Sequence, residues 1–202
     1  MSMLKERDEA LCAANPARPA SWFFNSFFFA KLFGDKSGKY NYSNVRRWSK
    51  KFDVFQMDKV VFPIMFQMDK VVFPININKT HWSLLCIYVQ MKRIVYHDSL
   101  NWSGRKYLEA ARQWIVDEAK DKKGIANYDV SDWELIDREP HVPQQMNGAD
   151  CGVFVILCAD FLSENLYLDY TQEDIEFYRR KIAADILRGS LNLWKLSPHP
   201  TS

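Results

Sequence analysis

The sequence contains little cysteine, glycine or proline, and it has no long run of one charge sign. With 7 glycines and 8 prolines among 202 residues, it is neither collagen-like nor linker-like. No apolar run reaches about 18 residues, so no membrane-spanning helix is predicted. The opening stretch MSMLKERDEALCAANPARPAS lacks the apolar core of a secretion signal. These absences favour a globular protein outside the secreted and membrane-inserted classes.

The four cysteines are Cys12, Cys86, Cys151 and Cys158, and no two of them form a CxxC pair. Disulfide frameworks and zinc sites need closer spacing, so neither is predicted. We expect reduced thiols, as in cytosolic or nuclear proteins. No cofactor is predicted either.

The charge pattern gives no sign of a nucleic-acid partner. The formal net charge is +2, and the densest basic cluster is RRWSKK at residues 46–51. A nucleic-acid-binding face usually carries a longer basic stripe. A solvated helix face is the favoured interpretation.

The composition, which is 48% apolar and 15% aromatic, predicts one globular domain. We place this domain at residues 22–195. Residues 1–21 are predicted to be a poorly ordered lead-in, in which one short helix could form. Residues 196–202 are predicted to be a tail. The aromatic stretch WFFNSFFFAKLF, at residues 22–33, is expected in the core.

One segment is duplicated: FQMDKVVFPI occurs at residues 55–64 and again at 66–75. Its VVFPI part has the β-branched and aromatic residues of a strand. We expect the second copy to keep the strand position and the first to be extruded. Pairing of the two copies as a hairpin is an alternative, and a duplicated exon or a faulty gene model is a further explanation.

The remaining pattern predicts an α+β domain with helices, then strands, then helices. Two strands, 81–90 and 93–100, are joined by a tight turn at Met91 and Lys92. A helix over 104–124 would bury one face, made of Tyr107, Leu108, Ala111, Trp114, Ile115 and Ala119. Further elements are expected as a short helix at 44–51 capped by Ser43, a short strand at 132–139, a helix at 151–164 and an amphipathic helix at 171–189.

Cys151 lies between loop-forming residues and a strongly apolar run, VFVILCADFL. It is therefore predicted to begin a helix, where free N–H groups and the helix dipole favour a thiolate. The same N–H groups can stabilise an oxyanion. Cys158 lies two turns deeper in the apolar run, and Cys86 lies inside an apolar strand. Both are expected to be inert core thiols.

A nucleophilic cysteine needs a histidine base and a group that orients the base. His81 begins one predicted strand, and Asp98 ends the next. Because the two strands form a hairpin, these ends should meet. His97 lies mid-strand, His141 lies in a loop and His199 lies near the end of the chain, and each of these three is weaker as a candidate base.

Three polar or aromatic residues near this constellation are further candidates. Gln145 and Gln144 both precede Cys151 closely enough for an amide to reach an oxyanion, and spacing alone does not choose between them. Trp82 follows His81, and it packs either in the core or over a narrow substrate channel.

These residues resemble a known family. HW followed by an apolar strand, then YHDS, then PQQMNGADCG, is similar to the SUMO-specific cysteine peptidases, the Ulp or sentrin-specific protease family. FNSFFFAKL, VRRWSKKFDVF, VVFPI, DWELI and EFYRRKIAADIL add to the resemblance, which runs from about Phe24 to Leu191. It implies a papain-like architecture with a central mixed or antiparallel sheet flanked by helices.

The resemblance also implies roles for residues. Cys151 would be the nucleophile, His81 the general base and acid, and Asp98 the orienting carboxylate. Gln145 would donate to the oxyanion, and Trp82 would cover the Gly-Gly tail of the substrate. Asn147 and Gly148 would be further substrate-binding residues.

The implied reaction is hydrolysis after the C-terminal Gly-Gly of SUMO, in precursors and in isopeptide-linked conjugates, through a thioester. The QQMNG loop favours SUMO over NEDD8. The implied partners are SUMO and its conjugates, and the implied state is a monomer in the nucleus, its envelope or the cytoplasm. In the family, a WLND-like segment closes the Gly-Gly channel, and no such segment precedes Phe24.

Three other functions are compatible with these features. A catalytically impaired SUMO-binding relative is the main alternative, because a channel that lacks one wall positions its substrate less well. A structural α+β domain with a fortuitous triad and an acyltransferase of similar triad architecture are the other two.

Overall fold

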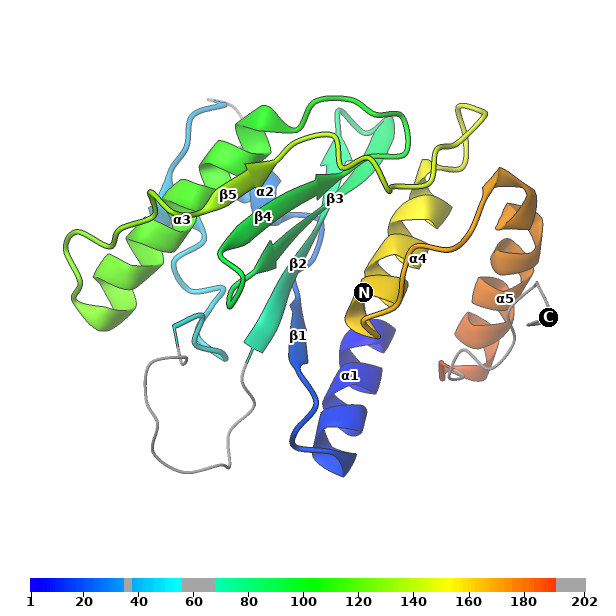
Figure 1. Cartoon of the computed structure of the whole chain (residues 1–202), viewed down its shortest axis with the longest axis horizontal. Coiled ribbons are helices and arrows are strands. Elements are labelled where there is room, and N and C mark those ends of the chain that lie inside the picture. The colour runs from blue at the N-terminus through cyan, green and yellow to red at the C-terminus, as the bar shows by residue number, and fades with distance from the viewer. Residues whose placement is uncertain (35–37, 56–67, 192–202) are drawn as a thin grey trace.

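The computed structural model describes residues 1–34, 38–55 and 68–191, and in this part of the chain one five-stranded sheet carries the fold (Figure 1). The order in the sheet follows the chain: β1 (Ala20–Phe23), β2 (Met68–Ile77), β3 (His81–Tyr88), β4 (Arg93–His97) and β5 (Glu134–Ile136). β2, β3 and β4 are antiparallel to one another, whereas β1 and β5 run parallel to their neighbours. The predicted mixed sheet of an α+β protein is confirmed.

Helices cover both faces of this sheet. They are α1 (Ser2–Ala14), α2 (Phe28–Leu32), α3 (Arg105–Lys123), α4 (Cys151–Ser163) and α5 (Ile175–Arg188), with 3-10 turns η1 (Tyr42–Asn44) and η3 (Gln172–Asp174). α2 and α3 lie on one face, α1 and α4 on the other, and α5 packs outside α4. None of the helices in the described ranges is long and apolar enough to span a membrane.

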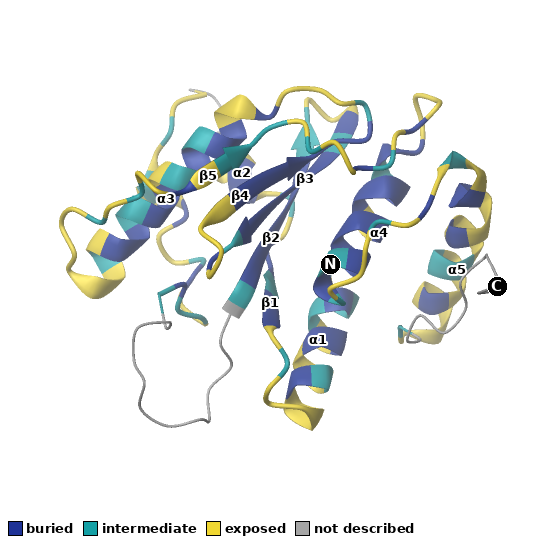
Figure 2. Ribbon diagram, viewed as in Figure 1, coloured by how far each residue is buried: buried dark blue, intermediate teal, exposed yellow. Residues whose placement is uncertain are grey.

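The alternation of side chains along β3 explains how both faces are buried (Figure 2). Leu85 and Ile87 point into the core shared with Trp114 of α3. Leu84 and Cys86 point the other way, into the core shared with α4. Successive strand residues face opposite sides, so one apolar strand supplies two cores.

The predicted buried face of α3 is confirmed, since all six of its expected residues are buried. The helix ends where Gly124 takes a left-handed conformation at φ 69°, which glycine adopts without steric cost.

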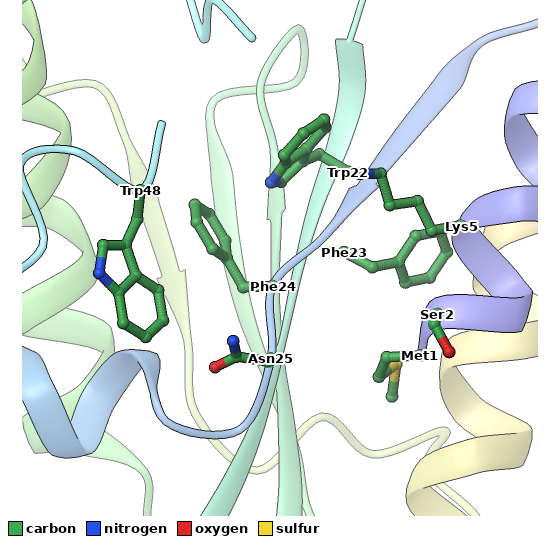
Figure 3. A pocket seen from close by; sticks show the side chains of 8 residues that line it. All are labelled: Met1, Ser2, Lys5, Trp22, Phe23, Phe24, Asn25 and Trp48. Atoms are coloured by element: carbon green, nitrogen blue, oxygen red, sulfur yellow. The ribbon is translucent and has the colours of Figure 1, made fainter. Parts of the chain in front are cut away.

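The aromatic stretch at residues 22–33 forms much of the core. The rings of Phe24, Phe28 and Phe29 lie 4.7, 4.7 and 5.5 Å from the ring of Phe73 in β2. A hollow of about 380 Å³ remains beside them, between α1 and β1 (Figure 3). There the Nζ atom of Lys5 lies 4.2 Å from the ring centroid of Trp22.

The second copy of the duplicated segment forms β2, as predicted. β2 pairs with β3 from Lys70–Tyr88 to Ile77–His81. A short turn joins the two strands, with Asn78 in a left-handed conformation. The second copy is contiguous with this turn and therefore takes the strand position. Apart from Phe55, the first copy at residues 55–64 lies outside the described residues.

The prediction of a poorly ordered lead-in at residues 1–21 is wrong. Helix α1 is 13 residues long, and the chain then enters β1. Leu4 and Cys12 are buried against the rest of the protein. Arg7 and Asp8 are buried too, because partners from distant parts of the chain compensate their charges.

The short helix predicted at residues 44–51 is also corrected. Asn41, rather than Ser43, caps a single 3-10 turn, and hydrogen-bonded turns follow it. The hydroxyl groups of Tyr42 and Ser49 each donate a hydrogen bond to Glu118 of α3, at 2.9 and 2.8 Å. These tertiary contacts outweigh the local helix signal.

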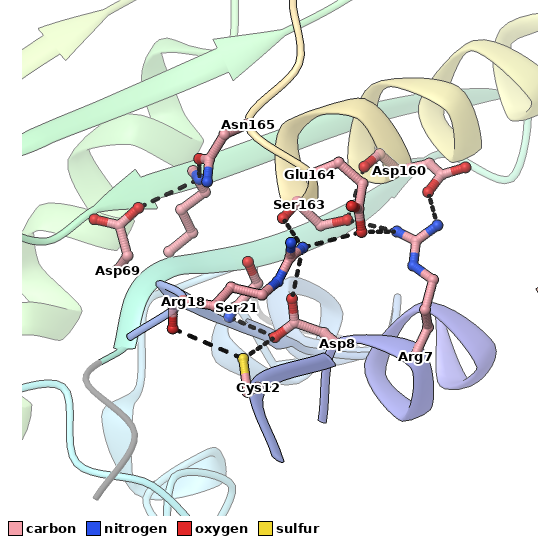
Figure 4. A network of polar contacts seen from close by, with 11 residues as sticks. Arg7, Asp8, Cys12, Arg18, Ser21, Asp69, Asp160, Ser163, Glu164 and Asn165 are labelled. Carbon is pink, nitrogen blue, oxygen red and sulfur yellow. Dashed lines mark hydrogen bonds and ion pairs between the residues drawn. The ribbon is translucent and has the colours of Figure 1, made fainter. Parts of the chain in front are cut away.

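A buried ionic network fixes α1 to the end of α4 (Figure 4). Arg7 pairs with Asp160 at 2.5 Å and with Glu164 at 3.2 Å. Arg18 pairs with Glu164 at 3.0 Å, and Asp8 accepts a hydrogen bond from the amide of Ser21 in β1 at 2.7 Å. The network therefore joins α1, β1 and α4.

We predict that Arg7→Met strongly destabilises the fold, because it leaves the buried carboxylate of Asp160 without the Arg7 counter-charge and removes one of the two arginine partners of Glu164. The expected loss in the free energy of unfolding is about 3–5 kcal/mol. Urea denaturation followed by circular dichroism measures it. The matched control is Arg180→Met, which removes the exposed pair with Glu176 and should cost less than about 1 kcal/mol. Equal losses in the two variants would contradict the prediction.

Candidate active site

The structure brings His81 and Asp98 together at one end of the sheet. His81 is the first residue of β3, and Asp98 directly follows β4. The Nε2 atom of His81 lies 2.9 Å from the Oδ2 atom of Asp98, and both side chains are buried. This pairing occupies Nε2 of the imidazole, so Nδ1 is the nitrogen that can exchange a proton with a thiol or a leaving group.

Two further donors hold the carboxylate of Asp98. The Tyr96 hydroxyl donates to Oδ2 at 3.1 Å, and the Leu100 amide donates to Oδ1 at 2.7 Å. Tyr96 reaches this position because Gly104 leaves space for its ring. A Cβ atom on Gly104 would lie only 2.2 Å from the Tyr96 ring. The orientation of the carboxylate is thus fixed from both sides.

Trp102 covers the imidazole of His81. The two ring centroids are 4.7 Å apart, and the rings are tilted by 53°. Sequence reasoning missed this residue, because neither its spacing nor its type separates it from a surface aromatic.

Cys151 begins α4, as predicted. It is the first residue of the helix, follows the N-cap Asp150, and is 5% exposed. The unpaired N–H groups of the first turn and the helix dipole therefore lie at its sulfur. The next residue, Gly152, lies against Trp82: a Cβ atom there would be 3.7 Å from the indole. The residues that follow Cys151 and His81 are thus neighbours.

The loop before Cys151 is organised by Asn147. Its Oδ1 accepts hydrogen bonds from the amides of Ala149 and Asp150, at 2.9 and 3.1 Å, and its Nδ2 donates to the Asp150 carboxylate at 2.6 Å. That bond, with others from Gln172 and Arg179, lowers the pKa of Asp150. The helix start is therefore anchored through an ionised carboxylate.

Gly148, in the same loop, is exposed, and a Cβ atom there would meet nothing within 4 Å. The Asn147 side chain is engaged within the loop. Their predicted role in substrate binding stays a prediction.

Gln144 and Gln145 differ in their surroundings. Gln145 is buried, and its Oε1 accepts a hydrogen bond from Ser99 at 2.6 Å while its Nε2 donates to the Asn147 carbonyl. Gln144 is exposed and donates to the Val142 carbonyl at 2.9 Å. Because the Gln145 amide is oriented toward the loop that leads to Cys151, it suits an oxyanion donor better than Gln144 does.

A cleft of about 560 Å³ adjoins the start of α4. Trp82, Ala149 and Gly152 line it near the cysteine, and Ile156 and Arg179 line it further away. Trp82 is half-buried, and its indole therefore forms a wall of this cleft. Across residues 1–34, 38–55 and 68–191, no group of three or more His, Cys, Asp or Glu side chains could hold a metal ion.

The other three thiols are poorly suited to chemistry. All four cysteines are free. Burial raises the pKa of Cys86 to about 12, that of Cys12 to about 11 and that of Cys158 well above its ordinary value. A thiolate, the reactive form, is therefore disfavoured at all three positions.

His97 and His141 are the other two histidines that the structure describes. His97 is buried on the face of β4 opposite Tyr96 and Asp98, and neither ring nitrogen has a hydrogen-bond partner among the residues that the structure describes. Burial lowers its pKa to about 4, so its imidazole is neutral. His141 is exposed in a loop, and His199 lies outside the described residues.

Comparison with known sequences gives one family. Residues 1–191 match the Ulp1 protease family, C-terminal catalytic domain. The chain is 32% identical over 192 residues to sentrin-specific protease 2 of Homo sapiens, covering 95% of this chain and 29% of that protein. It is 36% identical over 193 residues to ubiquitin-like-specific protease 1A of Arabidopsis thaliana, covering 93% of this chain and 35% of that protein. The chain thus spans about a third of these relatives.

Solved structures agree with the sequence matches. The C-terminal Ulp1 protease domain, solved in complex with Smt3, the yeast ortholog of SUMO, superimposes with a TM-score of 0.66 at 31% identity. The match covers 93% of this chain and 75% of that domain. The fold is therefore shared over nearly the whole chain.

We predict that His97 makes stability depend on pH. Its pKa is about 4 in the folded protein against an ordinary value of 6.5, so between these values only the unfolded chain takes up the proton. Stability is therefore lost as pH falls from 6.5 towards 4, by about 3 kcal/mol at roughly 1.4 kcal/mol per pKa unit.

Urea denaturation at several pH values between 7.5 and 4.5 measures this loss. In His97→Leu the dependence on pH over this range should be much weaker than in the wild type. His141→Gln, at an exposed histidine, should keep the wild-type dependence. Parallel losses in the wild type and His97→Leu would show that other groups cause the effect.

Proposed function

The chain belongs to the Ulp1 protease family, and we propose that it is a cysteine protease that hydrolyses the peptide or isopeptide bond after the C-terminal Gly-Gly of SUMO. The similarity to sentrin-specific protease 2 supports the substrate class. So does the likeness to a Ulp1 domain solved in complex with the yeast ortholog of SUMO. We assign the nucleophile to Cys151, the base to His81 and the orienting carboxylate to Asp98.

One observation carries this proposal: a buried His81–Asp98 pair, joined at 2.9 Å, lies where the first residues of β3 meet the first residues of α4. An imidazole fixed by a carboxylate is the base that a cysteine nucleophile needs. A cysteine at a helix N-terminus is the thiol that such a base can activate.

In the proposed acylation step, Nδ1 of His81 takes the proton of the Cys151 thiol, and the thiolate attacks the carbonyl carbon of the terminal glycine. The C–N bond then breaks, and the imidazolium gives its proton to the departing amine. Asp98 holds the imidazole in one tautomer and stabilises its positive charge. The products are a SUMO thioester of Cys151 and a free amine.

In the proposed deacylation step, His81 takes a proton from water, and the hydroxide attacks the thioester carbonyl. The C–S bond breaks, the SUMO carboxylate leaves, and the Cys151 thiol is restored. The negative charge on the carbonyl oxygen is held in both steps by N–H groups at the start of α4 and by the Gln145 amide. A side-chain amide has two N–H donors. The bond to the Asn147 carbonyl therefore leaves one donor available.

Selection for Gly-Gly follows from the Trp82 wall. The indole lies against Gly152, one residue from the nucleophile. A tail that runs along this wall towards Cys151 can lie close to the indole where it has glycine, but not where it has larger side chains. We assign substrate-tail contacts to Trp82, Asn147 and Gly148. We further propose that the protein acts as a monomer in the nucleus or cytoplasm, where its four free thiols stay reduced.

Cleavage of a SUMO precursor by the purified chain tests this function. Cys151→Ser and His81→Ala should each lower kcat/KM by at least about 10³-fold. Asp98→Asn should lower it by about 10²- to 10⁴-fold, because the imidazole loses its orienting charge. Cys158→Ala, which removes the other thiol of α4, should keep wild-type activity.

A folded wild-type chain that binds SUMO without cleaving it would contradict the proposed activity. Such a result would identify the chain as the catalytically impaired SUMO-binding relative instead. Circular dichroism and SUMO binding by calorimetry, measured on the same preparation, separate that case from a misfolded chain.

A further inference from the structure

Trp102 has two features that together point to a function. It lies on the buried imidazole of His81, at 4.7 Å between ring centroids, yet it is itself 50% exposed. Its indole thus extends from the proposed base to the solvent. A ring in that position contacts whatever lies beside the base on its solvent side.

The loop that carries Trp102 is held at both ends. On one side, Asn101 adopts a left-handed conformation at φ 56°, and its amide donates to the Asp98 carbonyl at 3.0 Å. On the other side, the Ser103 hydroxyl and the Gly104 amide donate to the Asp137 carboxylate, at 2.5 and 2.8 Å. The indole is therefore presented in one orientation before any substrate arrives, which reduces the entropic cost of binding.

The chemistry of acylation places the leaving group next to this ring. The departing amine takes its proton from the imidazole of His81, so its nitrogen must lie within hydrogen-bonding distance of that imidazole. Trp102 contacts the same imidazole, at 4.7 Å between ring centroids, so a leaving group whose chain leads to solvent on that side passes the indole.

We propose that Trp102 binds the leaving group and favours isopeptide substrates, by contacting the lysine side chain whose ε-nitrogen is released. This inference rests on the proposed function. A lysine arm is four unbranched methylenes, which lie flat on an aromatic face. The leaving group of a precursor instead begins with a branched α-carbon and a peptide plane, which fit a flat ring less closely.

The charge that develops in the reaction strengthens this contact for either leaving group. The nitrogen is positively charged once the imidazolium has protonated it in the tetrahedral intermediate, and it leaves as a neutral amine when the C–N bond breaks. An indole face attracts a cation within about 6 Å. Trp102 therefore stabilises the leaving group more in the protonated intermediate than in the ground state, and this lowers the barrier.

An alternative role for Trp102, the shielding of His81 from water, would give a different experimental result. If Trp102 only shields His81 from water, its removal should slow every substrate by the same factor. A contact to the leaving group should instead slow only substrates that have a large leaving group. The dependence of the loss on the leaving group therefore distinguishes the two roles.

The test compares kcat/KM for three substrates that share the SUMO part: a lysine isopeptide conjugate, a linear precursor and a C-terminal methyl ester, whose leaving group is too small to reach Trp102. Trp102→Ala should lower kcat/KM for the isopeptide by about 5- to 20-fold. It should lower kcat/KM for the methyl ester by less than about twofold. Trp102→Phe, which keeps an aromatic face, should retain most of the isopeptide activity.

Tyr167→Ala serves as the matched control, because Tyr167 is an aromatic residue that is 93% exposed in the segment after α4. It should leave all three rates unchanged. Equal losses for the isopeptide and the methyl ester in Trp102→Ala would overturn the proposal in favour of shielding. Unchanged rates for both would overturn it as well. A wild type that fails to cleave even the methyl ester would instead refute the proposed function itself.

Discussion

The register of the β3–β4 hairpin is the constraint on which the candidate site depends. Pairing of Leu84 with His97 and of Tyr88 with Arg93 sets how far each strand extends past the other. At this register the side chain of His81 meets that of Asp98. A slip of one residue would turn one of them to the opposite face of the sheet. The two apolar cores resist such a slip, because it would move Leu85 and Ile87 out of the core that they share with Trp114 and into the opposite core.

The position of the proposed nucleophile depends on a second set of contacts, outside the sheet. Helix α4 carries Cys151 at its first residue and packs its apolar side against β3. Its beginning is anchored through Asp150, which is bonded to Asn147, Gln172 and Arg179. Its end is anchored to α1 through Arg7. A helix fixed at both ends holds its N-terminus, and so the sulfur, in a defined place relative to the hairpin.

Much of this architecture was predictable from local patterns. The hairpin, α3 with its buried face, α4 and α5 were predicted from periodicity and from helix start and stop signals. The meeting of His81 and Asp98 followed from hairpin geometry alone. These features depend on residues close in sequence, where spacing fixes geometry.

The features that were missed depend on distant residues. The order of helix α1 was missed, because the partners that bury Arg7 lie more than 150 residues away. Residues 44–51 do not form the predicted helix, because the hydroxyl groups of Tyr42 and Ser49 donate hydrogen bonds to Glu118. Trp102 covers His81 only because Asn101 adopts a left-handed conformation, which the sequence does not specify. Such contacts have no signature in a single sequence.

We propose that the His81–Asp98 pair activates Cys151 alone among the four thiols. Labelling with SUMO that carries a C-terminal electrophile, followed by mass spectrometry of the peptides, tests it most directly. We expect a single adduct, on Cys151, which forms much more slowly in His81→Ala. An adduct on Cys12, Cys86 or Cys158, or equal labelling of Cys151 in His81→Ala, would contradict it. So would a folded wild-type chain that takes up no label.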